Sequence, residues 1–123
     1  MFKQLKALVP RKTRVEYETE TLKYVSEGTY KPDFIITLPS GHKIYIEAKG
    51  NGPQFDASIR RKLVEVRDQN PHIDLRLLFY RDGKVMGSQR RKDGSFFKQS
   101  EWAIRNGFDF AIGEVPDIWF KEI

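Results

Sequence analysis

Two short β-rich segments separated by a turn impose the strongest constraint on how this sequence folds. Residues 33–38 (DFIITL) and 43–49 (KIYIEAK) flank Pro39-Ser40-Gly41, a composition typical of a turn. The pattern predicts an antiparallel hairpin. With the turn centred between the segments, the register places Asp33 opposite Glu47.

Alternation along the two strands separates their side chains into two faces. One face is wholly apolar and is expected to be core: Phe34, Ile36, Leu38, Ile44, Ile46 and Ala48. The other face carries Asp33, Glu47 and Lys49.

The rest of the chain reads as further strands and helices. Residues 14–25 alternate as a half-exposed strand, and Asp56 is a good N-cap for a helix that ends before Pro71. Residues 73–80 read as a strongly apolar strand, and a short helix is expected over 99–106. This order predicts an α/β (α+β) fold with a central mixed sheet flanked by helices.

Composition narrows the class of protein. A length of 123 residues indicates one domain, and a net charge of +5 favours a polyanionic partner. The sequence has no cysteine, which excludes disulfide scaffolds, cysteine zinc sites and thiol catalysis. No apolar run is long enough for a signal peptide or a membrane span, so we expect a soluble, cytoplasmic protein.

The charged face of the hairpin has the residue types of a metal-dependent hydrolase. Two carboxylates about 5 Å apart across a strand pair repel each other unless a cation lies between them. Lys49 supplies part of that charge, and Mg²⁺ or Mn²⁺ bound by Asp33, Glu47 and the Ala48 carbonyl would supply more. Such a site hydrolyses phosphodiesters. The alternative is an ordinary solvated cross-strand charge pair.

The same residues carry a resemblance to a known family. Residues 30–34 (YKPDF) and 46–50 (IEAKG) resemble the PD-(D/E)xK nuclease signature, whose fold is a restriction-endonuclease-like core. Further segments resemble, in order, the phage endonuclease I family: Lys3-Gln4-Leu5, Glu16-Tyr17-Glu18, Arg61-Lys62, Pro71 to Phe79, Glu101-Trp102 and Gly107.

The resemblance implies a role for each residue of the motif. Asp33 would contact both of two metal ions, and Glu47 and the Ala48 carbonyl would be ligands of one. Lys49 would be the catalytic lysine. The implied activity is that of a Mg²⁺- or Mn²⁺-dependent endodeoxyribonuclease, a Holliday-junction resolvase that cuts four-way and other branched DNA.

The resemblance also implies an assembly and a location. Family members are homodimers with exchanged N-terminal segments, which would make residues 1–28 the exchange segment and 29–123 the catalytic core of a single nuclease domain. The protein would be of phage or prophage origin and act in the bacterial cytoplasm.

One family residue has no counterpart in the sequence. The family's fourth catalytic residue is an N-terminal glutamate, whereas the first acid here is Glu16. A second metal ion is then held by fewer protein ligands, or Glu16, Glu18 or Glu20 substitutes, or the natural start lies upstream. We favour the first, because alternation places these glutamates on a strand face expected to be solvent-exposed.

Two basic clusters are candidate DNA contacts. One lies on the predicted helix and the other in a loop: Arg60, Arg61, Lys62 and Arg67, and Arg90, Arg91 and Lys92. Either set could bind phosphates or be a solvated surface. Two rival functions remain open, namely a related nicking or restriction-type nuclease and a junction-binding module with weakened catalysis.

Overall fold

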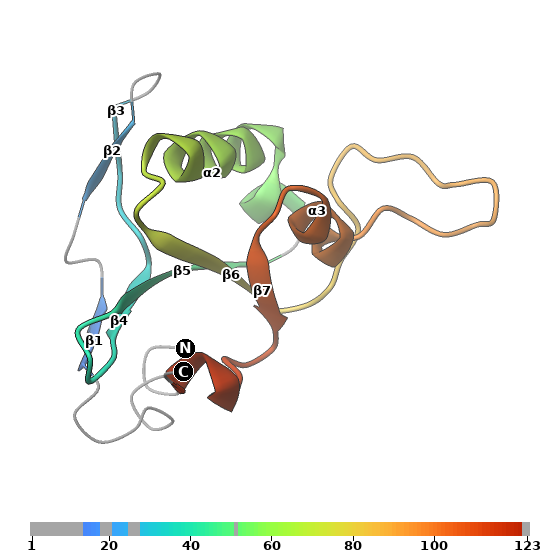
Figure 1. The fold of residues 1–123 in the computed structure, drawn as a ribbon. Coiled ribbons are helices and arrows are strands. Elements are labelled where there is room, and N and C mark those ends of the chain that lie inside the picture. The colour runs from blue at the N-terminus through green and yellow to red at the C-terminus, as the bar shows by residue number, and fades with distance from the viewer. Residues whose placement is uncertain (1–13, 18–20, 25–27, 51, 122–123) are drawn as a thin grey trace.

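A central five-stranded sheet organises the computed structural model, which describes residues 14–17, 21–24, 28–50 and 52–121 (Figure 1). Its strand order is β1-β4-β5-β6-β7, with antiparallel pairing on the β1 side of β5 and parallel pairing on the β7 side. The strands span Arg14–Tyr17, Phe34–Thr37, Lys43–Lys49, Asp74–Phe79 and Asp109–Ile112. The predicted mixed sheet flanked by helices is confirmed.

The β4–β5 hairpin has the predicted register. Phe34 lies opposite Ile46, and the Leu38 amide donates to the His42 carbonyl at 2.8 Å. Gly41 closes the turn with a φ of +96°, a backbone conformation that residues other than glycine rarely adopt. In this register, the next positions away from the turn after Phe34 and Ile46 are Asp33 and Glu47.

Helix α2 (Ala57–Gln69) connects β5 to the parallel strand β6. Its N-terminus is capped as predicted, because the Asp56 carboxylate accepts from the Ile59 amide at 2.9 Å. Leu63 and Val66 face the sheet and are buried. Helix α3 (Gln99–Arg105) lies beside α2, and both cover one face of the sheet (Figure 1).

The sheet is buried on both faces. The face under the helices packs Ile35, Tyr45, Leu77 and Phe79 against α2 and α3. The opposite face carries the predicted apolar set of the hairpin, and the 3₁₀ helix η2 (Asp117–Phe120) covers it with Trp119 and Phe120. The charged face of the hairpin is therefore covered by a helix instead of being open to solvent.

The expected strand over 14–25 is divided between two sheets. β1 joins the main sheet, whereas β2 (Leu22–Tyr24) pairs with β3 (Gly28–Tyr30) in a separate two-stranded sheet. Alternation is the same in both parts, so it does not reveal the change of partner. The short elements β7 and η1 (Gly52–Phe55) were not predicted either. In the described part of the chain, no helix has the length and apolar character of a membrane span.

Candidate active site

Glu47 is the buried centre of the candidate site. It lies near the end of β5, and only 3% of its surface is exposed. The Tyr30 hydroxyl donates to its Oε1, and the Lys49 Nζ lies 2.9 Å from its Oε2. Both carboxylate oxygens thus have a partner inside the fold.

Asp33 contacts β5 at Ala48, the residue after Glu47. It immediately precedes β4, and its Oδ2 accepts a hydrogen bond of 2.9 Å from the Ala48 amide. The N–H and C=O of one strand residue point to the same side of the strand, so the Ala48 carbonyl also points toward β4. The neighbouring Lys49 carbonyl points to β6 instead, where it accepts from the Tyr80 amide at 3.0 Å. The Asp33 carboxylate and the Ala48 carbonyl therefore lie on the same side of β5.

Asp33, Glu47 and Lys49 line a pocket of about 430 Å³ under α2. It holds the two acids together with lysines from three elements or their flanks, and its walls are Thr21, Tyr30, Lys31, Asp33, Glu47, Lys49, Ile59, Lys62 and Leu63. Lys62 reaches the pocket from α2, with its Nζ 5.8 Å from the centre of the Tyr30 ring. Acids surrounded by lysines suit a phosphate-bearing substrate once a cation has neutralised the acids.

Burial raises the pKa values of Glu47 and Tyr30. It raises the pKa of Glu47 from 4.5 to about 7; the charge of Asp33 adds to the rise, and Lys49 opposes it. Burial, and after it Glu47, raises the pKa of Tyr30 well above its usual value. The Tyr30 hydroxyl therefore keeps its proton and remains a donor to Glu47 at neutral pH.

The donor set fits a hard divalent ion. It consists of two carboxylates and the Ala48 carbonyl, and Mg²⁺ characteristically binds one or two carboxylates while keeping several waters. Burial and, after it, the charge of Asp33 raise the Glu47 pKa, and a bound cation would offset both by stabilising the ionised carboxylate. Within the described ranges, no group of three or more His, Cys, Asp or Glu side chains forms a fuller metal cage.

Glu16 does not lie on a solvent-exposed face as expected. It is half-buried and sits opposite Ile35, whose side chain belongs to the face covered by α2. Strand β1 extends a sheet that is covered on this face, which explains the difference. Glu16 thus shares the face of Asp33 and Glu47, while Glu18 and Glu20 lie outside the described residues.

The cations predicted on α2 divide into two groups. Arg60 donates to the Phe55 carbonyl at 2.6 Å, and Arg67 donates to the Asn106 carbonyl while packing on the Phe108 ring. Both arginines therefore hold the fold together. Arg61 is exposed, and Lys62 lines the pocket.

The cations predicted in the loop lie outside this pocket. Arg90, Arg91 and Lys92 are exposed in the segment between β6 and α3. The structure thus brings Lys62 to the acids and leaves the loop residues at a separate surface.

Tyr30 is a site residue that the sequence did not identify. It ends β3, a strand that was not predicted, and contributes a buried hydroxyl directly to Glu47. The available signal was an aromatic residue with a hydroxyl just before Pro32-Asp33. A buried tyrosine usually finds a hydrogen-bond partner, and the neighbouring acids offered one.

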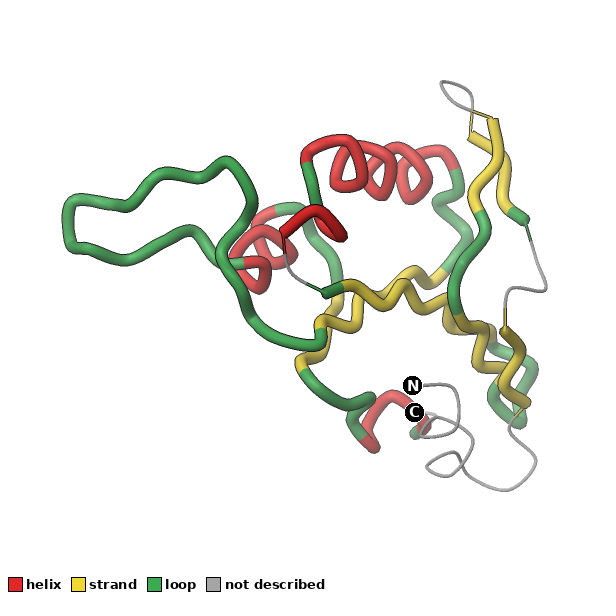
Figure 2. The backbone as a smooth tube through the Cα atoms, turned by 180° about the vertical axis from the view of Figure 1, so that it is seen from behind, coloured by secondary structure: helices red, strands yellow, loops and turns green. Residues whose placement is uncertain are grey.

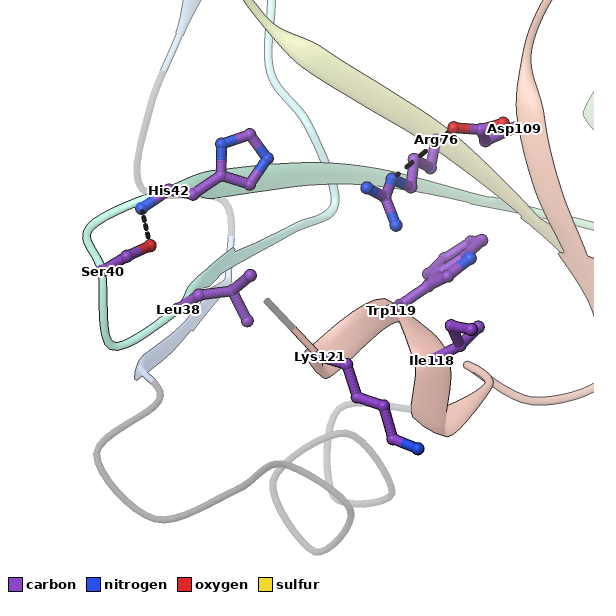
Figure 3. Close-up of a pocket in the computed structure, with 8 residues that line it drawn as sticks. All are labelled: Leu38, Ser40, His42, Arg76, Asp109, Ile118, Trp119 and Lys121. Atoms are coloured by element: carbon purple, nitrogen blue, oxygen red, sulfur yellow. Dashed lines mark hydrogen bonds and ion pairs between the residues drawn. The ribbon is translucent and has the colours of Figure 1, made fainter. Parts of the chain in front are cut away.

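A larger pocket, of about 530 Å³, lies on the opposite face of the sheet (Figure 3). Its Arg76 is held by Asp74 at 2.8 Å and lies over the Trp119 ring at 5.2 Å, and His42 also pairs with Asp74 at 2.8 Å. Figure 3 shows the ion pair between Arg76 and Asp109, whose Nε and Oδ2 atoms are 4.0 Å apart. These charges compensate one another, so we assign the chemistry to the smaller pocket with the converging acids.

The fold and the site together define a class of protein. A mixed sheet whose central hairpin presents an Asp, then a Glu and a Lys two residues apart, is the arrangement of PD-(D/E)xK nucleases. Residues 2–123 match the Phage endonuclease I family, and the chain belongs to that family.

Two curated relatives support this assignment. Endonuclease I of Escherichia phage T7 is 34% identical over 122 residues, which cover 95% of this chain and 72% of the relative. Endodeoxyribonuclease 1 of Enterobacteria phage T3 is also 34% identical, over 95% of this chain and 71% of that protein. The similarity extends well beyond the motif.

Removing the Tyr30 hydroxyl should destabilise the protein. In Tyr30→Phe the ring remains, but Glu47 loses a buried hydrogen bond, so we expect the free energy of unfolding to fall by about 1–3 kcal/mol. Tyr80→Phe is the matched control, because Tyr80 is 48% exposed. Urea denaturation of both variants measures the difference, and equal stability of the two would contradict the assigned bond.

The stability of metal-free protein should depend on pH through Glu47. Because the folded-state pKa of about 7 lies above 4.5, the folded protein keeps a proton that the unfolded chain releases between these values. The contribution of Glu47 to the free energy of unfolding therefore falls as pH rises from 4.5 to about 7. Glu47→Gln should remove this fall. As pH rises from 4.5 to 8, its free energy of unfolding should therefore gain up to about 3 kcal/mol relative to that of wild type. Denaturation with a chelator present measures it, and a difference that stays constant with pH would refute the shift.

Proposed function

We propose that this protein is a Mg²⁺- or Mn²⁺-dependent endodeoxyribonuclease that hydrolyses phosphodiester bonds in four-way and other branched DNA. The observation that best supports this proposal is that Asp33, Glu47 and Lys49 line one pocket, with Asp33 bound to the backbone of Ala48 between the other two. The two curated relatives are named as an endonuclease and an endodeoxyribonuclease, which supports DNA as the substrate.

The protein's own residues have distinct roles in this proposal. Asp33, Glu47 and the Ala48 carbonyl would hold one or two metal ions, which when bound polarise the phosphodiester and lower the pKa of water. Lys49 orients the attacking water and offsets the negative charge that develops on the phosphate. Its contact with Glu47 keeps the ammonium group next to the acids.

Two further groups support these residues. Tyr30 holds Glu47 through its hydroxyl, and Lys62 brings a second ammonium group to the pocket wall. A phosphate adjoining the cleaved bond would find Lys62 on the α2 side and Lys49 on the β5 side. The pocket therefore has cations on two sides of its acids.

A homodimer would provide the second site that symmetrical cleavage of a junction requires. The proposal includes exchange of the N-terminal segment, residues 1–28, between two copies, with 29–123 as the catalytic core. It also includes action in the cytoplasm of a bacterial host, which the phage origin of both curated relatives supports.

Loss of any one of the three catalytic side chains should stop cleavage without preventing binding. We expect Asp33→Asn, Glu47→Gln and Lys49→Ala each to reduce nicking of a four-way junction at least about a hundredfold. Junction affinity, measured with a chelator present, should stay close to that of wild type. Asp68→Asn is the control, because Asp68 is an exposed acid on α2. Parallel loss of binding and cleavage in the three variants would count against the assigned roles.

Metal dependence has its own readout. Calorimetry should detect Mn²⁺ binding to wild type and its loss in Asp33→Asn, and a chelator should abolish nicking. A protein that binds junctions yet neither binds Mn²⁺ nor nicks DNA would be a binding module instead of an enzyme.

Branched DNA should be preferred to linear duplex. We expect binding to a four-way junction at least about tenfold tighter than to a matched linear duplex, because several duplex arms offer phosphates at once. Competition binding and cleavage on both substrates measure the preference. Equal cleavage of the two would point to a related nuclease with a linear substrate.

A further inference from the structure

The segment between β6 and α3 projects from the body of the molecule. Figures 1 and 2 show it extending away from the sheet and from both helices. We refer to residues 81–98 as the projecting loop. It contains six cationic side chains and only two acidic ones, namely Arg81, Lys84, Arg90, Arg91, Lys92 and Lys98 against Asp82 and Asp93.

Hydrogen bonds order the base of the projecting loop. The Val85 amide donates to the Phe97 carbonyl at 2.8 Å, and Lys84 and Lys98 form a β-bridge. At the same end, Asp82 accepts from the amide and hydroxyl of Ser100, at 2.9 and 2.6 Å, in the first turn of α3. The base is therefore attached to the core on both sides.

The tip of the projecting loop is a defined turn. The Arg91 amide donates to the Ser95 carbonyl at 2.7 Å, and Gly94 adopts a φ of +90° as its amide donates to the Arg91 carbonyl. Asp93 accepts from the Ser95 hydroxyl at 2.6 Å. A loop that is already ordered loses less conformational entropy when it binds a ligand.

Both acids of the projecting loop are thus used internally, whereas most of its positive charge is not. Arg91 pairs with Glu101 at 2.7 Å. Lys84 and Arg90 lie over the same ring, Phe96, at 4.8 and 4.9 Å from its centre. Such contacts hold like charges close together without neutralising them.

Arg90 and Lys92 are the cations best placed for an external partner. Both are exposed, and within the part of the chain that the structure describes no carboxylate forms an ion pair with either. By contrast, Arg60 and Arg67 of α2 are bound to backbone carbonyls. The projecting loop therefore offers exposed positive charge without a carboxylate partner, and a regularly charged polyanion is the ligand that suits it.

The projecting loop is also fixed in position relative to the active site. It leads directly into Gln99, a fully buried residue whose Nε2 donates to the Gly50 carbonyl at 3.4 Å. Gly50 follows Lys49 in the chain. A ligand held by the loop is thereby placed at a set distance from the catalytic strand.

We propose that the projecting loop is a second DNA-binding element, in which Arg90 and Lys92 contact backbone phosphates of a duplex segment away from the bond that is cut. Arg91 and Phe96 maintain the shape of the loop. This role rests on the proposed function only in taking DNA as the substrate. Because phosphate contacts carry no sequence information, the loop adds affinity and orientation instead of sequence preference.

Salt-dependent binding tests the proposal. With a chelator present to prevent cleavage, dissociation constants of full-length protein for a four-way junction are measured over a range of NaCl concentrations. Arg90→Gln/Lys92→Gln should reduce the slope of log Kd against log salt by about 2, since each phosphate contact contributes about 0.9. Arg90→Lys/Lys92→Arg keeps both charges and should keep the wild-type slope.

The control removes a positive charge elsewhere. Lys121 lines the pocket on the opposite face of the sheet. Lys121→Gln should therefore leave the slope of log Kd against log salt within about half a unit of the wild-type slope. Single-turnover nicking at saturating protein should be the same for Lys121→Gln and wild type, because Lys121 does not line the active-site pocket.

The outcomes separate this proposal from the proposed function. An unchanged slope in Arg90→Gln/Lys92→Gln, or an equal change in Lys121→Gln, would overturn the role of the projecting loop while leaving cleavage intact. Failure of wild type to nick DNA with Mg²⁺ or Mn²⁺ would instead overturn the nuclease assignment. Lys92→Gln alone, a change at the exposed tip, should reduce the slope by about 1 and provides a second, less disruptive variant.

Discussion

The register of the β4–β5 hairpin is the constraint on which the site depends. A shift of one residue would exchange the two faces of a strand, sending Ile44 and Ile46 toward α2 and Glu47 into the apolar layer under η2. That shift would bury the charge of Glu47 without a partner. The apolar side chains of the hairpin therefore specify, through their own burial, that Asp33 meets Ala48 and that Glu47 meets Tyr30 and Lys49.

Helix α2 covers the acidic face of the hairpin, and this enclosure raises the energetic cost of placing charge on the two carboxylates. A carboxylate in an open sheet would be solvated, whereas Glu47 is enclosed by Tyr30, Lys49 and the α2 side chains of the pocket. Its raised pKa expresses the energy of holding a second negative charge near Asp33 in this environment. A bound cation would relieve that energy, so the enclosure that raises the cost of two charged carboxylates would also favour the proposed metal.

The sequence predicts the parts of the molecule that depend on local patterns. The hairpin register follows from one turn and one apolar face, and α2 follows from the Asp56 cap and its apolar stripe. The pairing of β2 with β3 was not predictable, because alternation shows that a strand forms but does not identify its partner.

The same limit applies to the site. Asp33, Glu47 and Lys49 belong to one hairpin and could be placed together from their spacing, whereas Tyr30 and Lys62 arrive from β3 and α2. The basic residues of α2 share a composition but not a role, since Arg67 reaches a carbonyl in a distant part of the chain. Composition reveals that charged side chains are present, and only tertiary contacts reveal which of them are already bound within the fold.

The acids and the exposed cations lie in different parts of the molecule, a separation that the net charge does not show. A DNA-cutting site needs carboxylates, yet carboxylates repel the phosphates that must approach them. Here the acids are enclosed in a pocket whose walls hold Lys31, Lys49 and Lys62, and a pocket of about 430 Å³ is too small to contact more than the immediate surroundings of one phosphodiester. Recognition of a branched duplex therefore has to come from surfaces outside it. Arg90 and Lys92 are exposed on such a surface, in a loop that is ordered by its own turn and joined through Gln99 to Gly50, the residue after Lys49.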